Sequence, residues 1–252
     1  MPVDFGPAAA DYDRYRTGFP PRLFTELAAL RVGVPGQRVV DLGTGTGILA
    51  RGFAAAGCTV TGLDVSPELL DRARQRDTGA PITYQVAPAE DTGLPGGSWD
   101  VVSAAQCWHW FDRPRVIEEV RRLLVPGGAL AICYRDYVST PGSVPAASEE
   151  LIVAHHPGWP LAGVEWSHPE WVDELARAGF GEVARVAFEV DVAFTHEAWR
   201  GRMRSSNGVA GSLSEAEVAA FDADLADLLR ARFPSEPLVV PHRIWAIVAR
   251  VS

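Results

Sequence analysis

The sequence contains no lysine. All 23 basic side chains among its 252 residues are arginines, and with 32 acidic residues the formal net charge is −9. No run of arginines stands out from this acidic background. A nucleic-acid partner needs a basic face that displaces counterions from phosphates. We therefore expect no nucleic-acid partner and take a small molecule as the expected substrate.

Cysteine is also scarce. Cys58, Cys107 and Cys133 lie far apart and form no C-x-x-C pair, so neither a disulfide framework nor a metal site is expected. No 18 apolar residues run together, so no membrane span is expected. Residues 1–13 lack a basic flank followed by an apolar stretch, which disfavours a signal peptide. We expect a cytoplasmic monomer or homodimer.

Short β-branched runs alternate with helical patterns between residues 37 and 134. The alternation predicts an α/β fold with a doubly wound, mostly parallel sheet. Pro126-Gly127-Gly128 is expected to end the last of the helices. Strands are predicted at Arg38–Leu42, Thr59–Val65, Ile82–Val86, Trp99–Ala105 and Ala129–Tyr134, and helices at Ile48–Ala56, after the N-cap Ser66, and at Val116–Leu124.

The rest of the chain has more helix and two late strands. The strands are expected to add to the sheet edge as an antiparallel pair, with the helical insertions as a cap. Residues 1–252 are predicted to form one domain, in which 1–36 are a lid and first helix, 37–134 the core, and 135–252 the cap insertions and last strands. Helices are predicted at Ala146–Ala154, Pro169–Ala178, Thr195–Arg204 and Ser214–Arg232, and strands at Val183–Val190 and Arg243–Val251.

A glycine-rich turn follows the first predicted strand and reads Asp41-Leu42-Gly43-Thr44-Gly45-Thr46-Gly47-Ile48. Glycines let a ligand approach the backbone, and the helix start offers N–H groups. A dinucleotide loop, G-x-G-x-x-G, would need glycine where Ile48 stands, which disfavours a nicotinamide dehydrogenase. The Asp41 carboxylate would accept hydrogen bonds from a ligand ammonium, directly or through water, and would repel a pyrophosphate. The alternative is an ordinary tight turn.

A second acid, Asp64, closes the second predicted strand at the edge where α/β sheets bind ligands. A carboxylate there can accept hydrogen bonds from both hydroxyls of a ribose. The alternative is an acid that only stabilises the start of the next helix.

These motifs together resemble the Rossmann-like class I S-adenosylmethionine-dependent methyltransferases, in particular the UbiE/methyltransferase type 11 group. The resemblance spans residues 39–134. It implies a seven-stranded sheet with an antiparallel last strand, S-adenosylmethionine as cofactor and S-adenosylhomocysteine as product. It rests on the D-x-G-x-G-x-G turn, Asp64, Ala87-Pro88-Ala89-Glu90-Asp91-Thr92-Gly93-Leu94-Pro95, Ser98-Trp99-Asp100 and Leu124-Val125-Pro126-Gly127-Gly128.

The resemblance also implies a role for individual residues. The turn residues Gly43, Thr44, Gly45 and Gly47 would hold the methionine end of the cofactor. Asp64 would bind the ribose, Val65 would lie against the adenine, and the Ala89 backbone and Glu90 would lie at the adenine edge. Gln106 is a further residue predicted to contact the cofactor. Many members carry Asp or Ser where Pro88 stands, so here Glu90 or a carbonyl must accept from the adenine amino group.

The N-terminal segment Asp11–Pro20 is similar to the Tyr-rich lead-in of trans-aconitate methyltransferase relatives, in which it folds over the cofactor as a lid. Tyr12 and Arg16 are then candidates to contact the methionine carboxylate. The alternative is a solvated terminus.

A Trp-His-Trp segment follows the fourth predicted strand. Trp108, Trp110 and Phe111 could wall the sulfonium cation, since aromatic faces attract cations. His109 could orient or deprotonate the acceptor, and Tyr134 is a further candidate acceptor contact. Alternatively Trp110 and Phe111 belong to the core and His109 is structural.

Arginines in the predicted cap are candidates to anchor an acidic acceptor. Arg200 and Arg204, four residues apart, would share one helix face. A solvated basic face is the alternative.

Methyl transfer is a displacement at the sulfonium carbon, so the protein mainly supplies orientation and no side-chain nucleophile is needed. The predicted function is methyl transfer to a small organic acceptor, with the oxygen of a carboxylate or hydroxyl as the expected target. The alternative is a cyclase that retains the cofactor, or a protein that binds it without transfer.

Overall fold

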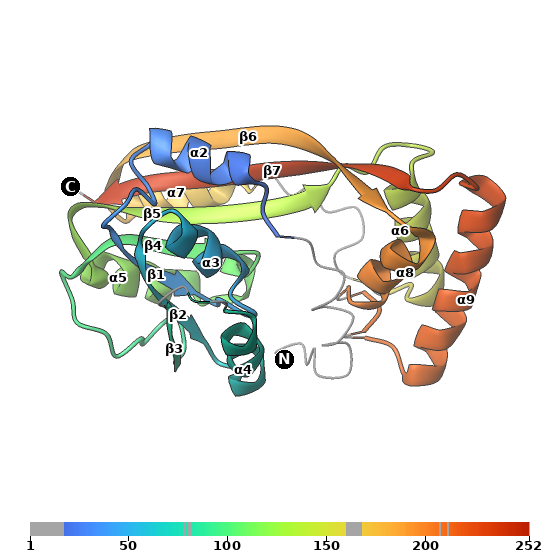
Figure 1. Cartoon of the computed structure of the whole chain (residues 1–252), viewed down its shortest axis with the longest axis horizontal. Coiled ribbons are helices and arrows are strands. Elements are labelled where there is room, and N and C mark those ends of the chain that lie inside the picture. The colour runs from blue at the N-terminus through green and yellow to red at the C-terminus, as the bar shows by residue number, and fades with distance from the viewer. Residues whose placement is uncertain are drawn as a thin grey trace. The chain divides into compact units, whose positions relative to one another are not determined.

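The computed structural model describes residues 18–77, 79, 82–159, 168–206, 208–210 and 212–251 (Figure 1). Tyr12 and Arg16 lie outside the described residues, so the predicted lid contacts remain a prediction.

A seven-stranded sheet forms the framework, in the order β3-β2-β1-β4-β5-β7-β6. β1 lies between β2 and β4 and is parallel to both, and the β2–β3 and β4–β5 pairs are parallel as well. β7 is antiparallel to both its neighbours. The predicted α/β fold with a mostly parallel sheet and an antiparallel last strand is confirmed. The strands are β1 Arg38–Leu42, β2 Thr59–Asp64, β3 Ile82–Val86, β4 Trp99–Ala105, β5 Leu124–Tyr137, β6 Phe180–Phe194 and β7 Leu238–Val251.

Five of the described helices, α4, α5, α6, α8 and α9, begin directly after a residue whose side chain caps one of their first N–H groups. Ser66 accepts a hydrogen bond from Leu69 N at the start of α4, and Ser214 and Glu217 form the predicted capping box of α9. The helices are α2 Pro21–Ala29, α3 Ile48–Ala55, α4 Pro67–Arg76, α5 Arg113–Leu123, α6 Val144–His155, α7 Pro169–Arg177, α8 His196–Arg204 and α9 Glu215–Arg232, with a 3₁₀ turn, η1, at Trp108–Trp110.

Several predicted boundaries were wrong. α5 starts at Arg113 and not at Val116, because the Asp112 side chain accepts from Arg115 N and caps the helix there. β6 and β7 are also longer than the segments 183–190 and 243–251 that their sequences predicted.

β5 begins at Leu124, before the Pro-Gly-Gly segment that was expected to precede it. Leu124 pairs with Trp99, and the next pair joins Ala129 to Val101. Residues 125–128 of β5 therefore lie opposite the single residue Asp100 of β4, at an irregularity of the ladder where Gly127 has φ +76°.

The described residues fall into two compact units, and strands β5, β6 and β7 contribute to both. The first unit contains the described residues of 18–135, 168–188 and 244–251, and its core includes Val40, Val102 and Ile132. The second contains those of 136–159 and 189–243, and α6, α8 and α9 build its core around Trp199 and Phe221. The prediction of a single domain is not tested by this grouping.

No helix in the described part of the chain is long and apolar enough to cross a membrane.

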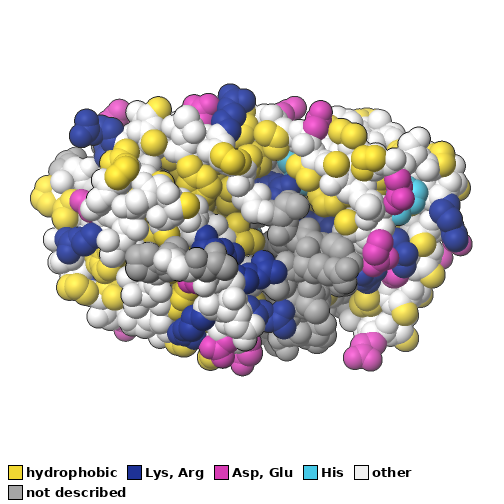
Figure 2. All heavy atoms as spheres, viewed as in Figure 1, with side chains coloured by type: hydrophobic (Ala, Val, Ile, Leu, Met, Phe, Trp, Pro, Cys, Tyr) yellow, Lys and Arg dark blue, Asp and Glu magenta, His cyan; other side chains and the backbone are white. Residues whose placement is uncertain are grey.

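Acidic and basic side chains both occur, interspersed with apolar ones, on the face seen in Figure 2. The expected absence of a nucleic-acid partner remains a prediction.

Candidate functional site

The glycine turn between β1 and α3 needs its glycines for two different reasons. Gly43 and Gly45 both adopt left-handed backbone, with φ of +59° and +55°. A Cβ on Gly43 would lie 2.8 Å from Cys107 Sγ, so this position is closely packed. A Cβ on Gly45 would meet no described atom within 4 Å. Among the described residues, no side chain therefore fills the space beside Gly45, and its contact with a ligand remains a prediction.

Asp41 supports this turn from within the sheet. It is 1% exposed, and its two oxygens accept hydrogen bonds of 2.7 Å from Thr44 Oγ1 and from Ser103 Oγ. Burial raises the pKa of Asp41 to about 6, although the two hydroxyls partly oppose that rise. Both oxygens already hold protein hydroxyls, so the geometry makes Asp41 a brace for the turn. The proposed contact with a ligand ammonium remains a prediction.

Sequence reasoning missed Ser103. It lies opposite Asp41 in the β1–β4 register. The signal available was a hydroxyl residue inside the apolar run Val101–Ala105 of a buried strand.

Asp64 is the last residue of β2 and holds the other side of the turn. Its Oδ2 accepts from Gly45 N at 2.8 Å and its Oδ1 from Ser66 N at 2.9 Å. Each carboxylate oxygen can accept a further hydrogen bond. Asp64 therefore orders both the glycine turn and the start of α4, and this arrangement is compatible with the ribose role and with the alternative.

Two apolar side chains are exposed beside Asp64. Val65 is 68% exposed, and Val86, which pairs with Asp64 in the sheet, is also exposed. The Asp64 carboxylate can accept hydrogen bonds from a sugar, and the exposed apolar surface beside it can contact a flat ring. Such a pair of features suits a ligand in which a ring is joined to a sugar.

The predicted adenine-edge segment is anchored by α5. Ala89 is buried, and Glu90 Oε1 accepts from Asp112 N at 2.9 Å. Both the backbone N–H and the hydroxyl of Thr92 donate to Glu119 Oε1. Hydrogen bonds from Arg122 lower the pKa of Glu119 to about 2, burial opposes this, and the Thr92 bonds add to the lowering. Sequence analysis did not identify Glu119, because nothing in the spacing links it to Thr92.

The Trp-His-Trp segment lies against the glycine turn. Cys107 and Phe111, which flank η1, are the side chains nearest to Gly43. Trp108 is fully buried in the core of the first unit, and its indole N–H has no hydrogen-bond partner among the described residues. Trp110 is 49% exposed. The sequence-based alternative that placed Trp110 in the core was therefore wrong.

The thiol of Cys107 is not a nucleophile in this setting. Burial, followed by the nearby Asp41 carboxylate, raises the pKa of Cys107 well above its usual value. The thiol lies 3.2 Å from the carbonyl oxygen of Leu42. A protonated thiol at this position fills space beside the turn.

His109 is joined to Tyr134. His109 Nδ1 lies 2.7 Å from the Tyr134 hydroxyl, and the His109 backbone N–H donates to the same oxygen at 3.3 Å. The imidazole also lies 4.5 Å from the Trp110 ring, between centroids. Gln106 has φ +62°, and its Nε2 donates to Arg135 O at 2.7 Å. The structure thus brings His109, Trp110 and Tyr134 together at the ends of β4 and β5.

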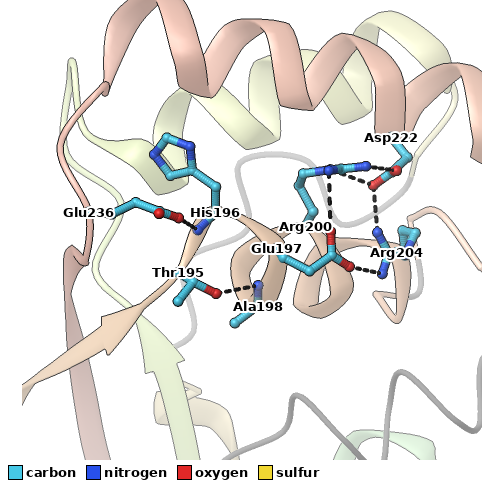
Figure 3. A network of polar contacts seen from close by, with 8 residues as sticks. All are labelled: Thr195, His196, Glu197, Ala198, Arg200, Arg204, Asp222 and Glu236. Atoms are coloured by element: carbon cyan, nitrogen blue, oxygen red, sulfur yellow. Dashed lines mark hydrogen bonds and ion pairs between the residues drawn. The ribbon is translucent and has the colours of Figure 1, made fainter.

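Arg200 and Arg204 lie on one face of α8, as their spacing predicted, and both bind acids (Figure 3). Arg200 Nε and Arg204 Nη1 lie 3.0 and 2.7 Å from Asp222 Oδ1. Glu197 pairs with both arginines, at 3.2 and 3.0 Å. Burial would raise the pKa of Asp222, but the two guanidinium groups hold it below its usual value.

This pairing bears on the two sequence-based roles of the arginines. The face they form is an ion-pair network with acids of α8 and α9, and an acidic acceptor would have to displace Glu197 or Asp222. Their role as substrate anchors remains a prediction.

The described residues contain no group of three His, Cys, Asp or Glu side chains that could hold a metal ion.

Comparison with known proteins agrees with this geometry. A family model described as "Methyltransferase domain" matches residues 40–132. A ubiquinone biosynthesis O-methyltransferase of Xanthomonas campestris pv. campestris is 30% identical over 187 residues, which are 72% of this chain and 76% of that protein. An uncharacterized methyltransferase of Mycobacterium tuberculosis is 38% identical over 135 residues. That match covers 53% of each protein, so it spans about half the length of this relative.

A solved structure from Anaeromyxobacter dehalogenans, named provisionally as a type II methyltransferase, is similar over nearly the whole chain. Its TM-score is 0.70 at 26% identity, and the match covers 94% of this chain and 97% of that one.

The sheet order and the glycine turn at its edge therefore define a methyltransferase of the Rossmann-like class. The chain belongs to the class I S-adenosylmethionine-dependent methyltransferases. This confirms the family predicted from the glycine turn. The likeness to trans-aconitate methyltransferase relatives remains a prediction.

Proposed function

We propose that this chain transfers the methyl group of S-adenosylmethionine to an oxygen of a small organic acceptor, either a carboxylate or a hydroxyl. The observation that carries the proposal is the glycine turn, which Asp41 braces from inside the sheet and Asp64 holds at its tip, and which no described side chain covers at Gly45. When bound, the cofactor supplies a methyl group already activated by the sulfonium.

The residues of the turn fit the methionine end of that cofactor. α3 begins at Ile48, and its N-cap residue, Gly47, supplies no side-chain cap for the first N–H groups of the helix. The positive end of the helix favours a carboxylate there. Gly43, Thr44 and Gly45 would supply the surrounding backbone.

The strand tips fit the nucleoside end. Asp64 would accept from the ribose hydroxyls, and Val65 would pack against the adenine. The Ala89 backbone and Glu90 would lie at the adenine edge, with Gln106 at the end of β4. The Glu119–Thr92 bonds keep the 87–95 segment in place for this contact.

Oxygen is proposed as the methylated atom because the Xanthomonas relative is named an O-methyltransferase. His109, Trp110 and Tyr134 would orient the acceptor, with Trp108 behind them. Arg200 and Arg204 are the proposed anchors for an acid, in exchange for one of their present partners.

Cofactor binding is tested by titrating S-adenosylhomocysteine into the purified protein in a calorimeter. Asp64→Asn should weaken binding roughly ten- to a hundredfold, since charge-assisted hydrogen bonds are lost. Asp100→Asn is the matched control, because Asp100 also accepts a backbone N–H, from Arg38 at 2.7 Å, but near the amino ends of the strands. Wild-type protein that does not bind would reject the proposal.

Methyl transfer is tested with labelled S-adenosylmethionine and a panel of small acids, phenols and amines. Mass spectrometry should show a product that gains one methyl group on oxygen. Methylated amines alone would refute the choice of oxygen. A product that is rearranged but not methylated would favour a cyclase.

A further inference from the structure

Ser103 places a hydroxyl group in the interior of a buried parallel strand. It is 0% exposed, and in the strand register it lies between Asp41 on β1 and Ala131 on β5. A buried hydroxyl needs a hydrogen-bond partner to offset the loss of water. The role of this hydroxyl therefore follows from its contacts inside the sheet.

The Ser103 hydroxyl proton is donated to Asp41. Ser103 Oγ lies 2.7 Å from Asp41 Oδ1 and 3.4 Å from Val40 O. The hydroxyl has one proton, and the first distance is typical of an O–H···O hydrogen bond whereas the second is long. A hydrogen bond to an ionised acceptor is also roughly twice as strong as a neutral one. Thr44 Oγ1 donates in the same way to the other carboxylate oxygen, at 2.7 Å.

This arrangement favours the ionised form of Asp41. A protonated carboxyl group must itself donate from one oxygen, so one of the two hydroxyls would have to turn away. For Ser103 the acceptor that would replace the carboxylate is Val40 O, at the longer distance. Burial raises the pKa of Asp41 to about 6, and the hydrogen bonds from Thr44 and Ser103 oppose that rise.

The charges around Asp41 do not neutralise it. Repulsion from Asp64, at the end of β2, raises the pKa of Asp41 further, and none of the described groups with the largest effect on this pKa is basic. On α3, Arg51 donates to Thr46 O at 2.8 Å and lies 3.5 Å from Asp77. The other titratable side chains that face Asp41 are a phenol and two thiols, whose pKa values are raised, mainly by burial: Tyr84 on β3, Cys107 after β4 and Cys133 on β5.

We propose that Ser103 is a positioning residue of the cofactor site, whose hydroxyl holds Asp41 in the ionised form, and that this buried negative charge favours the cationic groups of the cofactor. This rests on the proposed function of the same turn. Ser103 is fully buried and acts only through Asp41. A bound cation and a proton are then alternatives at Asp41, so cofactor binding near pH 6 releases a proton from this carboxyl group to the solvent.

The ionisation of Asp41 can be measured without ligand. Carboxyl ¹³C chemical shifts of aspartate-labelled protein are followed from pH 4 to pH 8, and Asp41→Asn identifies the Asp41 signal. We expect a pKa of about 6 in the wild type. In Ser103→Ala the pKa should be higher by about one pH unit, since a hydrogen bond to the charged form is lost.

Ser148→Ala is the matched control. Ser148 is also 0% exposed, but its hydroxyl donates to Val144 O and accepts from Trp199 Nε1, and not from or to a carboxylate. The substitution removes a buried serine hydroxyl in the same way as Ser103→Ala. It should leave the pKa of Asp41 unchanged.

The link to the cofactor is tested by calorimetry of S-adenosylhomocysteine binding in buffers of different ionisation enthalpy, which counts released protons. If the ligand ammonium lowers the pKa of Asp41 by about one pH unit, the wild type should release roughly 0.4 proton per ligand at pH 6 and roughly 0.1 at pH 7. Ser103→Ala should release roughly 0.4 at pH 7. Asp41→Asn gives the baseline from all other groups. A purely structural role of Ser103 would weaken binding without moving this pH dependence.

An unchanged pKa of Asp41 in Ser103→Ala would overturn the inference, and so would equal proton release by the wild type and Asp41→Asn. If Ser103→Ala does not fold, Ser103→Cys takes its place, because a thiol is only a weak donor, and the same upward change of the pKa is expected. Failure of S-adenosylhomocysteine to bind would reject the proposed function, whereas the titration of the unliganded protein would still test Ser103. The two failures are therefore distinguishable.

Discussion

Replacing Asp41 by Asn should change how the stability of the protein depends on pH. Asp41 is buried beneath the glycine turn, and burial raises its pKa from 3.8 to about 6. At 1.36 kcal/mol for each pH unit, this amounts to about 3 kcal/mol. That is the cost of keeping an ionised carboxylate at this site at neutral pH.

The direction in which stability changes with pH follows from proton binding. Between about pH 4 and pH 6 the folded protein holds a proton on Asp41 that the unfolded chain has lost. The Asp41 contribution is therefore fully present below about pH 4, and it is lost as the pH rises through 6. Wild-type stability should fall across this window relative to a variant that does not titrate there.

Asn can take over the hydrogen bonds of Asp41. Its carbonyl oxygen can accept from Thr44, and its amide can donate to Ser103 Oγ. The Ser103 hydroxyl can then donate to Val40 O, which already lies 3.4 Å away. The substitution thus removes the charge and leaves both hydroxyls with a hydrogen-bond partner.

The assay is urea unfolding of both proteins at several pH values from 4 to 7.5, without cofactor. The free energy of unfolding of Asp41→Asn, relative to wild type, should rise by about 2.4 kcal/mol across this range, because at pH 4 the unfolded chain still holds part of its proton. Other titrating groups are common to both proteins and cancel in the difference. A difference that stays flat with pH, or falls, would refute the reasoning.

Two further predictions follow from the turn and from the second unit. Gly43→Ala should lower the free energy of unfolding by about 2–4 kcal/mol, from the strain of left-handed backbone and the clash with Cys107. Gly45→Ala should lower it by about 1–2 kcal/mol, from the strain alone, and should also weaken S-adenosylhomocysteine binding. Urea unfolding and calorimetry would measure both, and equal losses of stability would contradict the packing seen at Gly43. Asp222→Asn should lower stability by about 1–3 kcal/mol, less at high salt, and leave cofactor binding unchanged. A salt-independent loss would show that the Arg200 and Arg204 pairs contribute little.

Much of the first unit could be predicted because its signals are local. The strand–helix alternation and the capping residue Ser66 depend on neighbours in sequence, and the structure has them where the sequence placed them. The late strands were underestimated because their polar residues interrupt the apolar pattern. The start of β5 was missed because Pro126-Gly127-Gly128 is a typical chain-breaking segment, whereas here it lies within a strand that pairs on both sides of it.

Partners far apart in sequence were the part that could not be predicted. Asp222 lies on α9, whereas Arg200 and Arg204 lie on α8. The spacing of the two arginines therefore predicted that they share a helix face, but it could not predict that Asp222 pairs with them. The His109–Tyr134 contact could have been predicted in part from the strand register. Ala105 pairs with Cys133 in parallel register, which places the residues after β4 near those after Cys133. His109 and Tyr134 were each predicted as candidate site residues, but only the strand register connects them.

The two carboxylates at the turn show why residue type and strand position leave a role open. Each is an acid near the carboxyl end of a parallel strand. Asp41 lies one residue before the end of β1, in register with Gly62 of β2 and Ser103 of β4, so strands on both sides enclose it. Asp64 is the final residue of β2, and the backbone after it leads to the exposed Val65. The two acids thus differ by one residue in their distance from the end of the strand. Asp41 is a buried brace whose pKa is raised to about 6. Asp64 lies at the sheet edge, holds the turn, and can accept further hydrogen bonds from a ligand.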